Sequence, residues 1–178
     1  ARFGHDGRQP EIPITKYDVW VFGYHRIGWK LCVALQRRGV SFAVVDDNPA
    51  AIAKLVERGI PHAFGDASDI EFLESLPLEH ANLIASTIPA RDTQLVILRH
   101  LRDRHAHAKT IVTTEHLRDR VELEADGADF VMMPHLLGGT WMADVLTDRP
   151  WTNATFAALR REEDAELKLP NSPRKKER

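Results

Sequence analysis

Short apolar runs alternate along this chain with segments of helical spacing, and the two patterns repeat six times. The runs are rich in β-branched and aromatic residues, so we predict strands at Asp18–Phe22, Phe42–Asp46, Pro61–Phe64, Leu83–Ser86, Thr110–Thr113 and Phe130–Met133. After each run, apolar residues recur three and four positions apart, which predicts helices at Arg26–Arg38, Pro49–Arg58, Ile70–Leu76, Arg91–His105, Leu117–Ala125 and Leu137–Leu146. The alternation therefore predicts an α/β domain with a parallel six-stranded sheet covered by helices on both faces.

The residues at the ends of the predicted helices support these boundaries. Asn48 suits the N-cap of the second helix, and Pro49 suits its first position. Gly39, Gly59 and Gly127 each follow a predicted helix, where a glycine commonly ends the last turn.

Composition excludes several classes of protein. The formal net charge is -2, so bulk charge does not indicate a nucleic-acid partner. The single cysteine, Cys32, excludes an internal disulfide, and we expect it to be a buried structural thiol in a reducing compartment. No apolar run approaches the ~20 residues that a membrane-spanning helix needs, and the N-terminus has no secretory signal.

We expect four segments along the chain. Residues 1–17 are polar and contain Gly and Pro, as in a linker or extended arm, and residues 18–148 form the α/β domain. Residues 149–168 form a C-terminal extension that includes a short helix, and residues 169–178 form a disordered basic tail. The chain does not begin with Met, which agrees with a piece of a longer protein, with tag removal or with processing.

A degenerate glycine motif follows the first predicted strand. It consists of Gly23, Tyr24, His25, Arg26, Ile27 and Gly28. This G-x-x-x-x-G pattern keeps the outer glycines of the dinucleotide-binding motif, which permit the tight turn and the close packing of helix on sheet. His25 stands where the middle glycine normally lets the backbone approach a pyrophosphate. The motif indicates a Rossmann-type doubly wound fold, although both glycines also suit a purely structural turn.

Acidic and anion-binding groups accompany this motif. The helix after Gly23 offers N–H groups and a positive dipole end to an anion, and Arg26 adds a charge. Asp46 ends the second strand, where a carboxylate accepts hydrogen bonds from ribose hydroxyls and repels a 2′-phosphate, so NADP is disfavoured. Asp47 follows it and shapes the loop. A capping or surface role for Asp46 is the alternative.

Other strand ends place polar residues at the same edge of the sheet. We expect Asp66 and Ala67, after the third strand, to hold the adenine base. Ser86 and Thr87, at the end of the fourth strand, face the same crevice and reach ribose or phosphate. The prediction is therefore a site for an adenine nucleotide.

Catalytic and metal sites find little support in the sequence. His100, His105 and His107 cluster, but their spacing fits no ligand pair on a helix, so we predict no metal site. No G-x-S-x-G motif occurs, and we predict that the chain is not an enzyme. An NAD-dependent oxidoreductase domain is the main alternative, and it needs a substrate domain for which only the residues after 148 remain.

Five segments together resemble the TrkA-N, or RCK N-terminal, domain family. These are Gly23–Gly28, Val44–Pro49, Gly65–Ala67, Ser86–Pro89 and Gly127–Asp129. More narrowly, they look like the cytosolic C-terminal regulatory domains of bacterial monovalent cation:proton antiporters of the potassium efflux type. The resemblance covers roughly residues 17–148. The chain departs from the family pattern at His25 and at Gln94, where many members carry Asn.

The resemblance implies a regulatory rather than a catalytic function. A domain of this kind dimerises, binds AMP, ADP, ATP or NAD(H), and regulates K⁺ or Na⁺ transport coupled to protons. Its partner would be a transmembrane antiporter domain, covalently linked at the N-terminus, at the cytoplasmic face of the bacterial inner membrane. An untethered peripheral subunit of a potassium uptake system stays open as a further alternative.

Overall fold

The computed structural model describes residues 16–25 and 27–168. Most of the expected arm, Arg26 and the expected basic tail lie outside these described residues. The chain divides into two compact units, Ala1–Met132 and Met133–Arg178. This division falls well before residue 148, where the sequence analysis places the end of the α/β domain.

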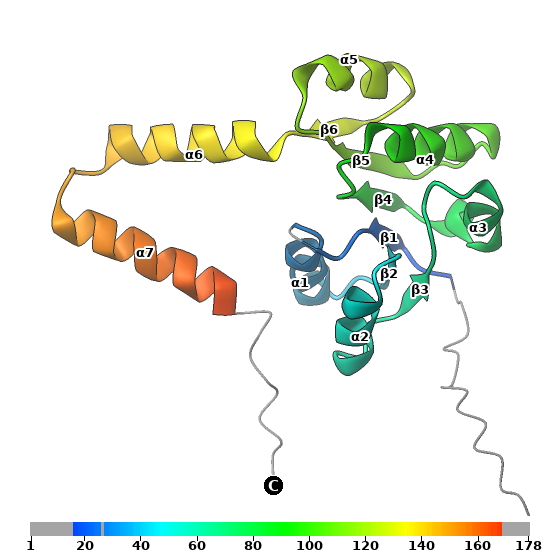
Figure 1. Ribbon diagram of the computed structural model, residues 1–178, viewed down its shortest axis with the longest axis horizontal. Coiled ribbons are helices and arrows are strands. Elements are labelled where there is room, and N and C mark those ends of the chain that lie inside the picture. The colour runs from blue at the N-terminus through cyan, green and yellow to red at the C-terminus, as the bar shows by residue number, and fades with distance from the viewer. Residues whose placement is uncertain (1–15, 26, 169–178) are drawn as a thin grey trace, which may run out of the picture. The chain divides into compact units, whose positions relative to one another are not determined.

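The first unit is built on one parallel sheet (Figure 1). Its strands are β1 (Val19–Phe22), β2 (Phe42–Asp46), β3 (His62–Phe64), β4 (Leu83–Ser86), β5 (Lys109–Thr113) and β6 (Phe130–Met132). Their order across the sheet is β3-β2-β1-β4-β5-β6, with every neighbouring pair parallel. The chain reverses its direction of winding between β1 and β4, as in a Rossmann-type doubly wound fold. The predicted fold class is therefore confirmed.

Five helices and one short 3₁₀ helix connect these strands. They are α1 (Gly28–Arg38), α2 (Pro49–Glu57), α3 (Ile70–Ser75), η1 (Leu78–His80), α4 (Arg91–Asp103) and α5 (Leu117–Ala125). The predicted start of the first helix at Arg26 is wrong: the helix begins at Gly28, with Ile27 as its N-cap. Asn48 caps α2 as predicted, accepting a hydrogen bond from the Ala50 N–H.

Side chains alternate between the two faces of the sheet, and each face has its own helices. Trp20, Phe22 and Ile84 lie on the face that packs against α3 and α4, in a cluster that includes Leu73 and Ile97. Val19, Val21 and Val44 lie on the opposite face with α1 and α2, in a cluster that includes Cys32, Ala51 and Leu55. Burial of Cys32 is thus confirmed, and it raises the pKa of this thiol to about 12. A third cluster joins α4 and α5 to β5 and β6.

The second unit consists of α6 (Pro134–Asp148) and α7 (Asn153–Lys168). Helix α6 is longer than predicted at both ends, because Pro134 serves as a first helical residue and the helix continues past Leu146 to Asp148, shortly before Pro150. Only Val145 of α6 is buried, and none of α7 is. The indole N–H of Trp151 donates to the Leu146 carbonyl, and Arg149 pairs with Glu162 at 3.2 Å. These helices hold few of their apolar side chains away from water.

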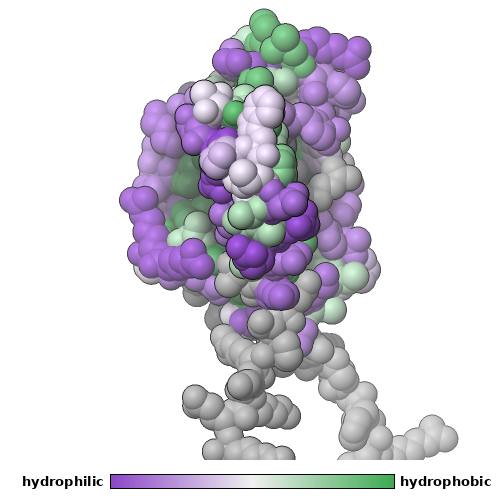
Figure 2. Space-filling model, turned by 90° about the vertical axis from the view of Figure 1, so that its left-hand side faces the viewer, coloured by the Kyte–Doolittle hydropathy of each residue, from purple (hydrophilic) through white to green (hydrophobic). Residues whose placement is uncertain are grey.

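The surface carries hydrophobic residues next to hydrophilic ones on the face seen in Figure 2. Leu117, Val121 and Phe130 of the first unit are more than half exposed. None of the helices within the described ranges is long and apolar enough to span a bilayer.

Candidate functional site

A cleft of about 320 Å³ opens at the carboxyl ends of four strands. Each strand contributes a short group of residues to its lining. These are Gly23 and His25 after β1, Val45, Asp46 and Asp47 from the end of β2, Gly65, Asp66 and Ala67 after β3, and Thr87, Ile88, Pro89, Ala90 and Thr93 after β4. The cleft lies where the winding direction reverses, which is where open α/β sheets bind ligands.

The glycine motif shapes one wall of this cleft. Gly23 has φ of 87°, and a Cβ there would lie 2.7 Å from the Thr87 hydroxyl. A Cβ on Gly28 would lie 1.9 Å from the carbonyl oxygen of Gly23, so only glycine lets α1 approach the turn this closely. Both outer glycines are therefore required by the backbone, whatever the cleft binds.

The helix start differs from expectation in its hydrogen bonds. The Gly28 N–H donates to the His25 carbonyl, and the Trp29 N–H donates to the Tyr24 carbonyl. These two donors, expected to be open to an anion, are already used within the turn. Arg26, the other expected anion contact, lies outside the described residues.

Asp46 joins two walls of the cleft. Its carboxylate is buried and accepts the Tyr24 N–H at 2.8 Å on Oδ2 and the Asn48 N–H at 2.8 Å on Oδ1. It thereby holds the glycine turn against the loop that follows β2. Each carboxylate oxygen has a second lone pair, so the expected hydrogen bond to ribose stays compatible with this structural role.

The loops after β2 and β3 supply two more carboxylates. Asp47 is exposed at the cleft. Asp66 is also exposed, and its Oδ1 accepts the Ser68 hydroxyl at 2.7 Å and the Ser68 N–H at 2.8 Å. These hydrogen bonds hold the pKa of Asp66 below its usual value. Ala67 is buried between this loop and the core.

Three of the expected residues do not present a side chain to the cleft. Ser86 is buried on the face of the sheet that carries Ile84, and its hydroxyl has no partner among the described residues. Tyr24 packs its ring between α1 and α2, where its hydroxyl meets Arg58. Burial raises the pKa of Tyr24. Ile27 caps α1 outside the lining.

Thr87 and Gln94 use their polar atoms to hold the loop after β4. The Thr87 hydroxyl donates to the Gly23 carbonyl at 2.9 Å. The fully buried amide of Gln94 donates to the Ile88 carbonyl and, at 2.9 Å, to the Thr113 carbonyl. Gln94 therefore fixes the part of the cleft wall that contains Ile88.

Sequence reasoning missed the contribution of α4 to the cleft. Ala90 and Thr93 line it from the start of this helix. The same rule that pointed to the ends of the strands could have found them, because the first turn of each following helix also lies at that edge.

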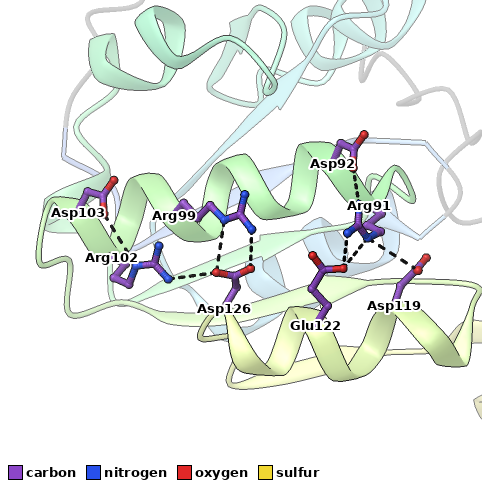
Figure 3. Close-up of polar contacts among 8 residues, drawn as sticks. All are labelled: Arg91, Asp92, Arg99, Arg102, Asp103, Asp119, Glu122 and Asp126. Atoms are coloured by element: carbon purple, nitrogen blue, oxygen red, sulfur yellow. Dashed lines mark hydrogen bonds and ion pairs between the residues drawn. The ribbon is translucent and has the colours of Figure 1, made fainter.

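Ion pairs anchor the start of α4 to α5 (Figure 3). The Arg91 guanidinium binds Glu122 and lies 4.0 Å from Asp119, both on α5. Further along, Arg99 and Arg102 both bind Asp126, which holds the pKa of that carboxyl below its usual value. Within the described ranges, no cluster of His, Cys, Asp and Glu has the arrangement of a metal site.

Solved structures of other proteins share this fold, and three of them are described here. The TrkA-N domain of inner membrane protein ybaL from Escherichia coli matches with a TM-score of 0.69 at 22% identity, over 74% of this chain and 98% of that one. The NAD(P)-binding domain of an exopolyphosphatase-related protein from Archaeoglobus fulgidus matches with 0.66 at 25% identity, over 75% and 99%. The Kef CTD of Shewanella denitrificans in its AMP-bound form matches with 0.62 at 19% identity, over 86% and 92%.

Sequence comparisons locate the chain more narrowly. Comparison with curated protein sequences gave no match. The family model of the TrkA-N domain matches residues 19–134, which include every strand of the sheet and every residue that lines the cleft. The chain therefore belongs to the TrkA-N domain family.

Proposed function

We propose that this chain is a regulatory domain that binds an adenine nucleotide and controls a monovalent cation:proton antiporter, with K⁺ or Na⁺ as the cation. The observation that carries the proposal is the cleft at the reversal point of the sheet, in which the Gly23 turn lies directly beside Asp46. No catalytic role is part of the proposal.

The lining suggests how the nucleotide would lie. Asp46 and Asp47 suit the ribose hydroxyls, because carboxylates accept hydrogen bonds and both lie at the end of β2. The base would lie between the Asp66–Ala67 loop and the apolar residues Ile88 and Pro89. A phosphate would lie toward the glycine turn and His25.

Calorimetry with AMP and with NAD tests the binding site. Replacing Asp46 with Ala should weaken binding by about 1–3 kcal/mol, the range for a lost hydrogen bond to a charged group. Asp18→Ala is the matched control, because Asp18 also accepts hydrogen bonds but lies at the opposite edge of the sheet. Equal affinity of the Asp46 and Asp18 variants would refute the assignment of the ribose site.

Regulation requires that the nucleotide distinguish two states of the transporter. A ligand shifts such an equilibrium only by its differential affinity, typically about 1–3 kcal/mol. The proposal draws support from the two structural neighbours described as an inner membrane protein and as an AMP-bound Kef CTD. It places the chain at the cytoplasmic face of the bacterial inner membrane, joined at its N-terminus to the transmembrane domain.

Ion flux through vesicles that contain the complete transporter tests this regulatory role. Addition of AMP or NAD(H) should change the flux, and the Asp46→Ala variant should lose the response. An unchanged response in a variant that no longer binds nucleotide would refute it.

We also propose that the chain acts as a homodimer. In the second unit, α6 exposes Leu136, Leu137, Trp141, Met142 and Leu146, each at 40% or more. A pair of helices with this much exposed apolar surface is typical of an interface. Sedimentation should show a dimer at micromolar concentration, and Trp141→Glu should dissociate it. A monomer at all concentrations would contradict the proposal.

A further inference from the structure

A closed circuit of contacts joins the wall of the cleft to both ends of α2. Asp46 accepts the Tyr24 N–H at 2.8 Å on one carboxylate oxygen and the Asn48 N–H at 2.8 Å on the other. Asn48 in turn caps the start of α2, because its side chain accepts the Ala50 N–H at 2.8 Å. The Asp46 carboxylate is therefore held between the glycine turn on one side and the first turn of α2 on the other.

Arg58 completes this circuit at the opposite end of α2. It is the C-cap residue of the helix, where the helix dipole favours a cation. Its guanidinium donates to the Tyr24 hydroxyl, and the guanidinium carbon lies 5.8 Å from the centre of the Tyr24 ring. Tyr24 is thus held twice, by its N–H at Asp46 and by its phenol at Arg58, on two parts of the chain that α2 connects.

The Tyr24 side chain makes this circuit rigid. Its ring is only 4% exposed and packs between α1 and α2, in the cluster that includes Ala51 and Leu55. Its carbonyl accepts the Trp29 N–H at 3.0 Å, which ties the same residue to the start of α1. Because a side chain in a close-packed core is confined to one rotamer, a displaced ring must also displace the backbone N–H that binds Asp46.

We infer that Arg58, which lies outside the cleft lining, is a positioning residue for the nucleotide: through Tyr24 and α2 it holds the Asp46 carboxylate in place for the ribose. The inference rests on the proposed nucleotide site and adds a residue to it. A carboxylate that is fixed before the ligand arrives loses little freedom on binding, and such preorganisation raises affinity. Loss of the Arg58 contact should therefore weaken binding although no contact to the ligand is removed.

Calorimetry with AMP as the probe tests this role in a double-variant cycle. Arg58→Ala should weaken AMP binding about three- to tenfold, and the same change in the Asp46→Ala background should weaken it by less than about twofold, because Arg58 acts through Asp46. Arg58→Lys should recover part of the loss, because lysine keeps a donor and a charge at the end of α2. Arg38→Ala removes an exposed arginine from the last turn of α1 and should leave the affinity unchanged. No loss from Arg58→Ala, or an equal loss in both backgrounds, would overturn the inference.

Hydrogen exchange in the absence of ligand separates this inference from the proposed function. In Arg58→Ala, the Tyr24 and Asn48 amides that donate to Asp46 should exchange at least about fivefold faster than in the wild type. The buried Val44 of β2, whose N–H is also hydrogen-bonded, should keep its rate, which distinguishes local loosening from a general loss of stability. Absence of AMP binding by the wild-type chain would overturn the proposed function. Normal AMP binding with unchanged exchange in Arg58→Ala would overturn the inference alone.

Discussion

At the ends of β1, β2 and β3, the first half of the sheet edge, carboxylates and a glycine turn lie open at the cleft. At the ends of β4 and β5, the second half, the polar side chains mostly donate to backbone carbonyls. Asp47 and Asp66 are exposed in the first half. In the second half, Thr87, Gln94 and Thr113 are buried and donate to backbone carbonyls. The first half thus presents exposed carboxylates to the cleft, whereas the second half uses hydroxyls and an amide to hold its backbone.

Under the proposed function, this difference separates the residues that would bind the nucleotide from those that support the cleft wall. Groups with unused hydrogen-bonding capacity recognise a ligand, whereas groups bonded to the backbone hold a wall in place. In the second half, the ion pairs from α4 to α5 continue that support away from the cleft. Substitutions should therefore affect binding mainly in the first half and stability mainly in the second, except where the first half is itself close-packed.

The close packing of α1 against the Gly23 turn, in the first half, gives the largest expected effect on stability. Gly28→Ala places a Cβ 1.9 Å from the Gly23 carbonyl oxygen, so α1 must move away from the turn. We expect a loss of about 3 kcal/mol in the free energy of unfolding, measured by urea denaturation. Gly138→Ala is the control, because this helical glycine has no atom within 4 Å of an added Cβ. Similar stability of the two variants would show that the close approach is not required.

In the second half, Gln94 should contribute most to stability, because its amide joins the loop after β4 to the end of β5. Gln94→Met keeps a similar volume but leaves the carbonyls of Ile88 and Thr113 without their side-chain donor. The loss of these two hydrogen bonds should cost about 1–2 kcal/mol in the free energy of unfolding, partly offset because the substitution also removes the Gln94 Oε1, a buried acceptor with no partner among the described residues. The exposed Gln36→Met variant should change stability little. If the Gln94 variant were as stable as the wild type, the amide would have no supporting role.

Asp129 should have a smaller effect on the free energy of unfolding, through hydrogen bonds that it makes to the start of β5. This carboxylate accepts the Thr110 N–H at 2.8 Å and pairs with Lys109, and both interactions lower its pKa. Because the folded-state pKa lies below the unfolded value, the stabilisation is complete above the ordinary value of 3.8 and is lost as the pH falls toward the lowered pKa. Asp129→Asn should therefore flatten the acid limb of the stability curve. Parallel curves for wild type and variant would contradict this account.

Most of the fold could be predicted from periodicity alone. The positions of all six strands followed from apolar runs, and Phe42–Asp46 and Leu83–Ser86 match the structure at both ends. The start of α1 could not be predicted in this way, because the spacing typical of a helix extends into the turn after Gly23, before the helix begins at Gly28. The division of the chain after Met132 was not predicted, although β6 ends there and Pro134 begins the next helix.

The candidate site was only partly predictable. The carboxylates at strand ends follow from topology, since parallel strands end at one edge. Ser86 could have been recognised as a buried residue, because strand alternation places it on the same face as Ile84. Thr93 enters the cleft through the orientation of α4, and the bonds of Gln94 join groups that only the folded sheet brings together. These contacts require the tertiary structure.

The central claim, that the cleft formed mainly by the first half is a nucleotide site, is tested most directly by nitrogen–proton correlation spectra recorded during titration with AMP. The account predicts that the amide signals of Gly23, Asp46, Ala67 and Ile88 move, while those of β6 and the far end of α5 stay in place. Shifts confined to β6 and α5, or no shift at millimolar AMP, would contradict it.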